Sequence, residues 1–114
     1  MASYTVKESK TYDRAAGAVI KSATEAIAQL GGSPSKKSKP EEGKLDANFN
    51  KKLGSKPLNN RIQLEVSVTS QSPEQCTVSV VAYPVDPVGQ KLMFGVQGQP
   101  ARLVLDAFLE QLGA

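Results

Sequence analysis

Two neighbouring segments alternate between apolar and polar residues, and this alternation constrains the fold more than any other feature of the sequence. Residues 61–69 read Arg-Ile-Gln-Leu-Glu-Val-Ser-Val-Thr, and residues 76–82 read Cys-Thr-Val-Ser-Val-Val-Ala. A period of two is that of a β-strand with one buried and one exposed face. Residues 70–74 between them are rich in turn formers, and Pro84 and Pro87 are predicted to end the second strand. The sequence therefore predicts two antiparallel strands whose apolar faces need a covering layer.

A first helix is predicted between Asp13 and Gly32. Asp13 is a favourable N-cap residue, and Gly31-Gly32 provides a left-handed stop. Between these ends, apolar residues recur at three- and four-residue spacing: Ala16, Val19, Ile20, Ala23, Ile27 and Leu30. Because much of this stripe is alanine, the helix is expected to lie close against a sheet.

A second helix is predicted at the carboxyl end of the chain. Pro100 suits its first position, where no amide donor is needed, and Gly113 closes it. Its apolar face is broad: Leu103, Val104, Ala107, Phe108, Leu109 and Leu112.

Three further segments have strand character. Residues 4–10 alternate and suit a short strand at a sheet edge, and residues 44–53 place four apolar side chains on one face. Residues 91–96 are ambiguous, because Gly95 weakens the pattern. The polar Ser/Lys/Pro segment 33–43 leaves a loop, an exposed edge and a mobile hairpin open.

The order of these elements is β-α-β-β-β-(β)-α, where the bracketed strand is the ambiguous one. Consecutive strands with short turns pair in antiparallel fashion, and one helix near each end must cover the apolar face. The sequence therefore predicts a two-layer α+β domain over residues 1–114, an antiparallel sheet covered by two helices.

This pattern resembles the small helix-grip modules typified by the repeated domains of BamC-type lipoproteins. The residues that carry the resemblance are Asp13-Arg14-Ala15-Ala16, Ala26-Ile27-Ala28-Gln29-Leu30-Gly31, Gly43-Lys44-Leu45 and Phe108-Leu109-Glu110-Gln111-Leu112. The likeness lies in the hydrophobic pattern, and the first loop departs from it by its lysines. The resemblance implies a helix-grip-like fold and a non-enzymatic interaction domain.

The composition removes most catalytic and metal chemistry. The 114 residues include no histidine and one cysteine. The usual zinc ligand, the commonest neutral-pH general base, Ser-His or Cys-His nucleophiles and thiolate clusters are therefore absent. The sequence predicts no cofactor and no enzyme, because acid/base work would fall on Asp, Glu, Lys or Tyr alone.

Positive charge is concentrated in one segment. Residues 32–61 contain eight basic and three acidic residues, and the rest of the chain carries a small negative balance. The segment is interpreted as a solvated loop, with electrostatic binding of nucleic acid as the alternative function. Its candidate contacts are Lys36, Lys37, Lys39, Lys44, Lys52, Lys56 and Arg61.

The space between the first helix and the sheet is a candidate binding groove. Small helical residues can leave room for an apolar ligand, or they can let the layers pack shut. The predicted lining residues are Val19, Ala23, Phe49, Leu103 and Phe108. A homodimer through a strand edge is a further hypothesis.

Three other features are candidates with simpler explanations. Cys76 is read as a buried structural residue. The run 95–100 could bind an anion at a helix start, although two glycines before a proline more often make a turn. One outward strand face could form a polar site with Gln63 or Glu65 opposite; its residues are Asp46, Asn48, Asn50 and Lys52.

The start of the chain is mixed polar and lacks the apolar stretch of a secretory signal, and no apolar run is long enough to span a membrane. A cytoplasmic protein is expected. The leading hypothesis is a non-catalytic domain that binds an unidentified protein or a small apolar ligand through its sheet face or its helix–sheet groove.

Overall fold

The computed structural model describes residues 4–35, 38–54, 56–58, 60–86, 88, 90–92 and 99–113. The elements in chain order are β1 (Val6–Tyr12), α1 (Ala16–Gln29), β2 (Ser33–Pro34), the 3-10 helix η1 (Pro40–Glu42), β3 (Lys44–Phe49), β4 (Lys52–Leu53), β5 (Lys56–Pro57), β6 (Arg61–Ser72), β7 (Gln75–Val85) and α2 (Pro100–Gly113).

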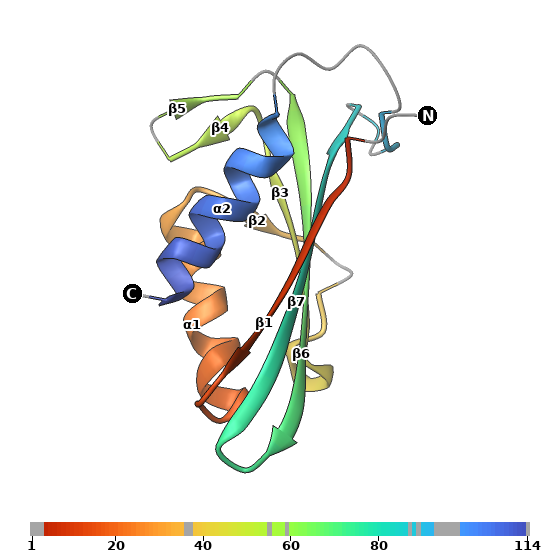
Figure 1. Cartoon of the computed structure of the whole chain (residues 1–114). Coiled ribbons are helices and arrows are strands. Elements are labelled where there is room, and N and C mark those ends of the chain that lie inside the picture. The colour runs from red at the N-terminus through yellow and green to blue at the C-terminus, as the bar shows by residue number, and fades with distance from the viewer. Residues whose placement is uncertain are drawn as a thin grey trace.

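A five-stranded antiparallel sheet forms one layer, in the order β1-β7-β6-β3-β2. Both helices lie on the same face of this sheet (Figure 1). The two-layer α+β class and the antiparallel sheet under two helices are therefore confirmed. Each central strand has one apolar face, which the helices bury, and this is why the strands alternate in sequence.

Pro84 lies inside β7, so the prediction that it ends the strand was wrong. It is opposite Ile62 on β6, and its carbonyl oxygen accepts a hydrogen bond from Leu92 N–H at 2.9 Å. The nitrogen and the carbonyl of a strand residue point to the same side, so the Pro84 nitrogen faces away from β6. The β1 pairing has already ended there, at Val6 opposite Ala82. Proline is tolerated because it displaces no ladder hydrogen bond.

The first helix begins later than predicted. Its N-cap is Ala15, with no side-chain hydrogen bond, so Asp13 is not the cap. The Asp13 carboxylate instead accepts a hydrogen bond from Gln75 Nε2 at 3.1 Å. The predicted end is confirmed: Gly31 has a φ of +88°, and Gly32 N–H donates to Ile27 O at 2.9 Å, which is a Schellman ending.

The core lies between the helices and the sheet. The alternating apolar residues of β3, β6 and β7 are buried beneath α1 and α2, which confirms the predicted inward faces. In α2 the buried positions are Pro100, Ala101, Val104, Leu105, Phe108, Leu109 and Leu112. Leu103 is 58% exposed, so its expected place in the buried face was wrong. The run 103–105 is apolar throughout, and the helical period selects the other two residues.

The region between β3 and β6 contains a small hairpin, β4–β5, that the sequence did not predict. Its two-residue strands are too short to show alternation. Gly54 N–H donates to Leu30 O at 2.6 Å, and Leu58 N–H donates to Lys51 O at 2.8 Å. The first bond ties the hairpin to the end of α1, and the second continues the pairing of β4 with β5 by one residue on each side.

The ambiguous strand before α2 falls mostly outside the described residues. Lys91 forms an isolated bridge with Val85, which extends the sheet locally beyond the start of β1. Residues 93–98 are not described, and neither are Lys36 and Lys37. No helix in the described part of the chain is long and apolar enough to span a membrane.

Candidate functional site

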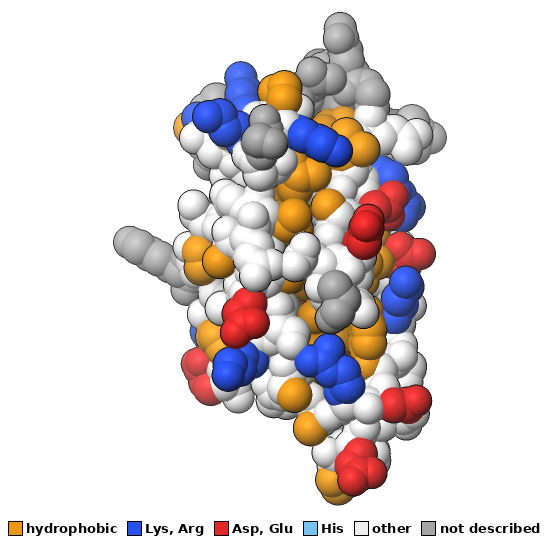
Figure 2. Space-filling model, turned by 90° about the vertical axis from the view of Figure 1, so that its left-hand side faces the viewer, with side chains coloured by type: hydrophobic (Ala, Val, Ile, Leu, Met, Phe, Trp, Pro, Cys, Tyr) orange, Lys and Arg blue, Asp and Glu red, His pale blue; other side chains and the backbone are white. Residues whose placement is uncertain are grey.

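The groove predicted between helix and sheet is filled by its own lining residues. Val19, Ala23, Phe49 and Phe108 are all 0% exposed and belong to one core cluster. Leu103 lies outside that cluster, so it lines no groove. On the helix side of the molecule, hydrophobic side chains form a narrow band between polar and charged ones (Figure 2). The sequence left an open groove and a closed one as alternatives, and the structure shows the closed one, because the small residues of α1 let the layers pack shut.

A hollow of about 240 Å³ does lie between α1 and the sheet, but at the sheet edge. We call it the edge hollow. Its walls come from α1, β2, η1 and β3 and from one residue between β2 and η1: Thr24, Ile27, Pro34, Ser38, Pro40, Leu45 and Asp46. Most of this lining is apolar, as expected for a site that binds a small apolar molecule.

The edge hollow forms because β2 is only two residues long. Ser35 N–H still donates to Asp46 O at 2.8 Å. Among the described residues, the next backbone pairing with β3 is at Lys39, which exchanges hydrogen bonds of 2.7 and 3.0 Å with Lys44. The Ser38 N–H between them donates to Ser35 O at 3.1 Å and not to β3. The sheet edge therefore stays open beside α1.

Two hydroxyl groups stand in the wall of the edge hollow. Thr24 Oγ1 donates to Ile20 O at 2.9 Å, so its lone pairs can still accept a hydrogen bond. Ser38 Oγ accepts a hydrogen bond from Asp46 N–H at 3.2 Å, and its own proton can be donated. Thr24 thus keeps an acceptor and Ser38 a donor among the residues that line the mainly apolar hollow.

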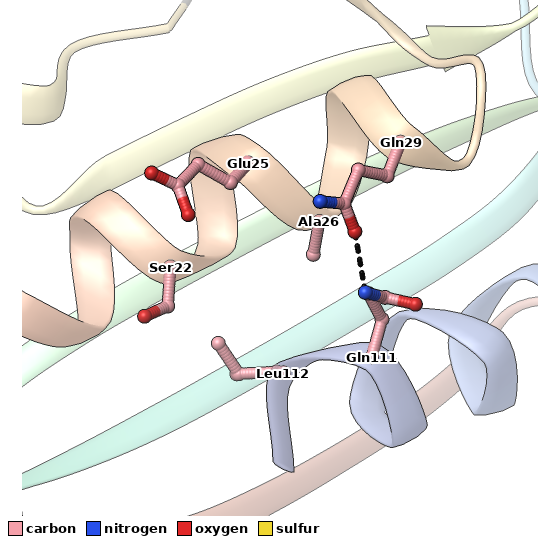
Figure 3. A pocket seen from close by; sticks show the side chains of 6 residues that line it. All are labelled: Ser22, Glu25, Ala26, Gln29, Gln111 and Leu112. Carbon is pink, nitrogen blue, oxygen red and sulfur yellow. Dashed lines mark hydrogen bonds between the residues drawn. The ribbon is translucent and has the colours of Figure 1, made fainter. Parts of the chain in front are cut away.

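A second, smaller pocket of about 140 Å³ lies between α1 and α2. In Figure 3, Gln29 and Gln111 point toward each other across it and are joined by a hydrogen bond. Ser22 and Glu25 add further polar lining from α1. This pocket is polar and partly bridged by its own side chains, so it suits an apolar ligand less well than the edge hollow.

The opposite face of the sheet carries a polar cluster that the sequence had suggested. Asp46 on β3 lies directly opposite Glu65 on β6, and Asn48 lies opposite Gln63. Like charges that face each other across two strands are destabilising unless donors compensate them. Here Gln63 Nε2 donates to Asp46 Oδ1, and Asn48 Nδ2 donates to Gln63 Oε1 at 3.2 Å. The register therefore sets the two carboxylates opposite each other, which the sequence alone left open.

Tyr83 completes this cluster, and the sequence analysis missed it. Its phenol donates to Glu65 Oε2 at 2.5 Å, and Lys91 Nζ lies 4.6 Å from the centre of its ring. Burial, the bond to Glu65 and the carboxylates of Glu65 and Asp46 all raise the pKa of Tyr83. The phenol therefore remains a donor at neutral pH. Alternation places Tyr83 on the outer face of β7, but only the register of β7 against β6 brings it beside Glu65.

The contribution of the Tyr83–Glu65 hydrogen bond to stability can be measured by removing the Tyr83 hydroxyl. We expect Tyr83→Phe to lower the free energy of unfolding by about 1 kcal/mol, the typical net value of one hydrogen bond. Urea unfolding of Tyr83→Phe, Glu65→Ala and the double variant gives the pairwise coupling. A coupling of about 1 kcal/mol is expected. Additive effects would contradict the bond.

In Figure 1, η1 (yellow) lies beside β6 in the lower half of the view, and the β4–β5 hairpin lies at the upper left, so the lysines near η1 and those of the hairpin are far apart. Lys39 pairs with Glu42 at 3.7 Å, next to η1. Lys44 lies on β3, and Arg61 begins β6. Lys52 and Lys56 lie in the hairpin. The described basic side chains are therefore distributed over several elements and do not form one patch. Nothing in this arrangement favours nucleic-acid binding.

The remaining candidates add no site among the described residues. Cys76 is 0% exposed, and burial raises the pKa of its thiol, as a structural cysteine requires. Most of the 95–100 run lies outside the described residues. Within the described residues, no group of three metal-binding side chains lies together.

No protein-family model matches this sequence, and no curated protein does. Solved structures share its fold at low identity. The di-domain ARO/CYC BexL from the BE-7585A biosynthetic pathway matches with a TM-score of 0.57 and 12% identity, over 96% of this chain and 44% of its own. A Thermobifida fusca protein solved by solution NMR matches with a TM-score of 0.50 and 13% identity, over 96% of this chain and 93% of its own. Zhui aromatase/cyclase from Streptomyces sp. R1128 matches with a TM-score of 0.51 and 11% identity, over 96% of this chain and 86% of its own.

These matches establish the fold alone, and the chain spans less than half of the di-domain protein. They also overturn one expectation. The prediction that the chain is not an enzyme was wrong to rest on its missing histidine and single cysteine. Proteins described as aromatase/cyclases share the fold over 96% of this chain. Lack of histidine removes particular mechanisms, but carboxylates and phenols also exchange protons. The resemblance to BamC-type modules is not tested by these matches and stays a prediction.

Proposed function

We propose that this domain binds a small, mainly apolar ligand of the phenol class in the edge hollow. The observation that carries the proposal is the hollow itself: about 240 Å³ between α1 and the open sheet edge, with apolar walls and two hydroxyl groups. A phenol combines an apolar ring with one oxygen that donates and accepts. It therefore matches the donor at Ser38 and the acceptor at Thr24 together.

The size of the hollow supports a ligand of one or two rings. An apolar cavity of about 150 Å³ is large enough to hold benzene. The edge hollow, at about 240 Å³, has room for a ring with substituents or for two fused rings. Larger ligands would need the walls to move.

The fold adds independent support. Two of the proteins with the same fold are described as ARO/CYC or aromatase/cyclase proteins, names that imply work on ring-forming or aromatic molecules. This support concerns ligand class only, at 11–12% identity. In this chain, the edge hollow between α1 and the sheet would bind the same kind of molecule.

Filling the hollow is expected to abolish most of the binding of 2-naphthol, a two-ring phenol. We expect the natural chain to bind this probe with a Kd of roughly 0.01–1 mM, given its few non-hydrogen atoms. Thr24→Leu replaces a wall hydroxyl with a larger side chain and should weaken binding at least about tenfold, as overfilling a packed site does. Titration calorimetry measures both affinities.

Ala28→Leu is the matched control. It adds similar bulk to α1, at an exposed position that lines none of the described pockets. Its affinity for 2-naphthol should equal that of the natural chain. Equal weakening by both variants, or undetectable binding by the natural chain at 1 mM probe, roughly the upper limit expected for so small a ligand, would count against the proposal.

A further inference from the structure

The two edges of the sheet differ in how open they are to a further strand. The β2 edge is two residues long and ends at Pro34. The β1 edge is seven residues long, contains neither proline nor glycine, and pairs only with β7 within the described residues (Figure 1). A long edge strand offers its outer row of backbone donors and acceptors to another chain.

The sequence of β1 is complementary to itself in the antiparallel direction. It reads Val6-Lys7-Glu8-Ser9-Lys10-Thr11-Tyr12. When a second copy is placed with Ser9 opposite Ser9, each Glu8 faces the Lys10 of the other copy. In the same register, Val6 faces Tyr12 and Lys7 faces Thr11. Opposite charges and an apolar–aromatic pair are the cross-strand combinations that stabilise a sheet.

The two faces of β1 agree with this register. Val6, Glu8, Lys10 and Tyr12 lie opposite residues 82, 80, 78 and 76 of β7, all of which are buried under the helices. The charged pair and the apolar pair therefore lie together on the helix side. On that side, Arg102 of α2 already holds Glu8, at 3.5 Å.

Neighbouring registers are worse. A shift that centres the pairing on Glu8 places two glutamates face to face, and one that centres it on Lys10 places two lysines face to face. A one-residue shift places residues of the helix-side face of one copy opposite residues of the outer face of the other. It also sets Val6 or Tyr12 opposite a polar residue. Ser9 is therefore the centre that the charges select.

We propose that two copies of this chain associate through β1, antiparallel and with Ser9 opposite Ser9, to join their sheets into one. Such an interface is small, so the dimer should form at chain concentrations of about 0.1–1 mM. This inference is independent of the edge hollow, which lies at the other edge of the sheet.

Charge reversal tests the pairing by sedimentation velocity of the full chain. Glu8→Lys and Lys10→Glu each create two like-charge contacts and should weaken the dimer about tenfold. An equimolar mixture of the two variants restores both opposite-charge contacts and should dimerise at least as well as the natural chain. Lys7→Glu is the matched control, since Lys7 faces Thr11, and should leave the dimer unchanged. Circular dichroism verifies that every variant is folded.

A cross-link tests the register separately. Ser9→Cys should form a disulfide between two copies under mild oxidation, because opposite strand residues lie within disulfide range. Lys7→Cys should not, since the two substituted positions lie about 13 Å apart along the paired strands. A natural chain that stays monomeric up to about 1 mM would overturn the proposal. So would a variant mixture that stays monomeric, or equal cross-linking by both cysteine variants.

Discussion

Phe108→Ala is expected to lower the free energy of unfolding by about 3–5 kcal/mol, the range for removing a buried aromatic ring. Phe108 is 0% exposed and lies in the cluster that joins α2 to the sheet. Its replacement leaves a cavity that α2 can only partly close. Urea unfolding followed by circular dichroism measures the loss.

Leu103→Ala, on the same helix, is the control for this prediction. Leu103 is 58% exposed, so its truncation should change stability by no more than about 0.5 kcal/mol. The pair of variants thus separates two residues that look equivalent in the sequence. Similar losses for both would show that α2 is rotated relative to the arrangement described above.

Gly43→Ala is expected to cost roughly 3 kcal/mol. Gly43 has a φ of +76°, and a Cβ there would lie 2.4 Å from the Val68 carbonyl oxygen. The left-handed backbone alone costs an alanine about 1–2 kcal/mol. The backbone clash must also displace β3 from β6 and weaken the 2.7 Å bond from Val68 N–H to Gly43 O, worth about 1 kcal/mol. Thermal and urea unfolding both report this loss.

Gly54→Ala isolates the backbone contribution. Gly54 has a similar φ of +63°, but a Cβ there meets nothing within 4 Å among the described residues. The change should therefore cost about 1 kcal/mol or less, since alanine also restricts the unfolded chain. A Gly43 variant as mild as the Gly54 variant would contradict the close approach of β3 and β6.

The sequence predicted the fold where local pattern and burial agree. Alternation in residues 61–69 and 76–82 assigned the inward faces of β6 and β7 correctly, because one face of the sheet is covered and the other is not. The prediction was wrong where several residues suited the same structural position equally well. Leu103 and Leu105 are both apolar, and the phase of α2 against the sheet buries Leu105 and exposes Leu103. Asp13 and Ala15 both precede α1, and the side chain of Asp13 is engaged by Gln75 instead of capping the helix.

The candidate sites depended on features that no single segment contains. The carboxylate pair needs the register of β3 against β6, which the sequence left open. Tyr83 joins it from a third strand. The edge hollow needs β2 to stop after Pro34, and a polar segment without periodicity does not reveal where its pairing ends. Tertiary pairing rather than composition therefore created both sites.

Intermolecular NOEs to bound 2-naphthol test the central claim most directly, because they locate the ligand rather than only detect it. The edge hollow predicts contacts from the naphthol ring protons to the methyl groups of Ile27 and Leu45. It predicts none to Val19, which is 0% exposed in the closed core. Contacts to Val19 instead of Ile27 and Leu45 would contradict the account, since they would place the ligand in an interior that the structure shows to be filled.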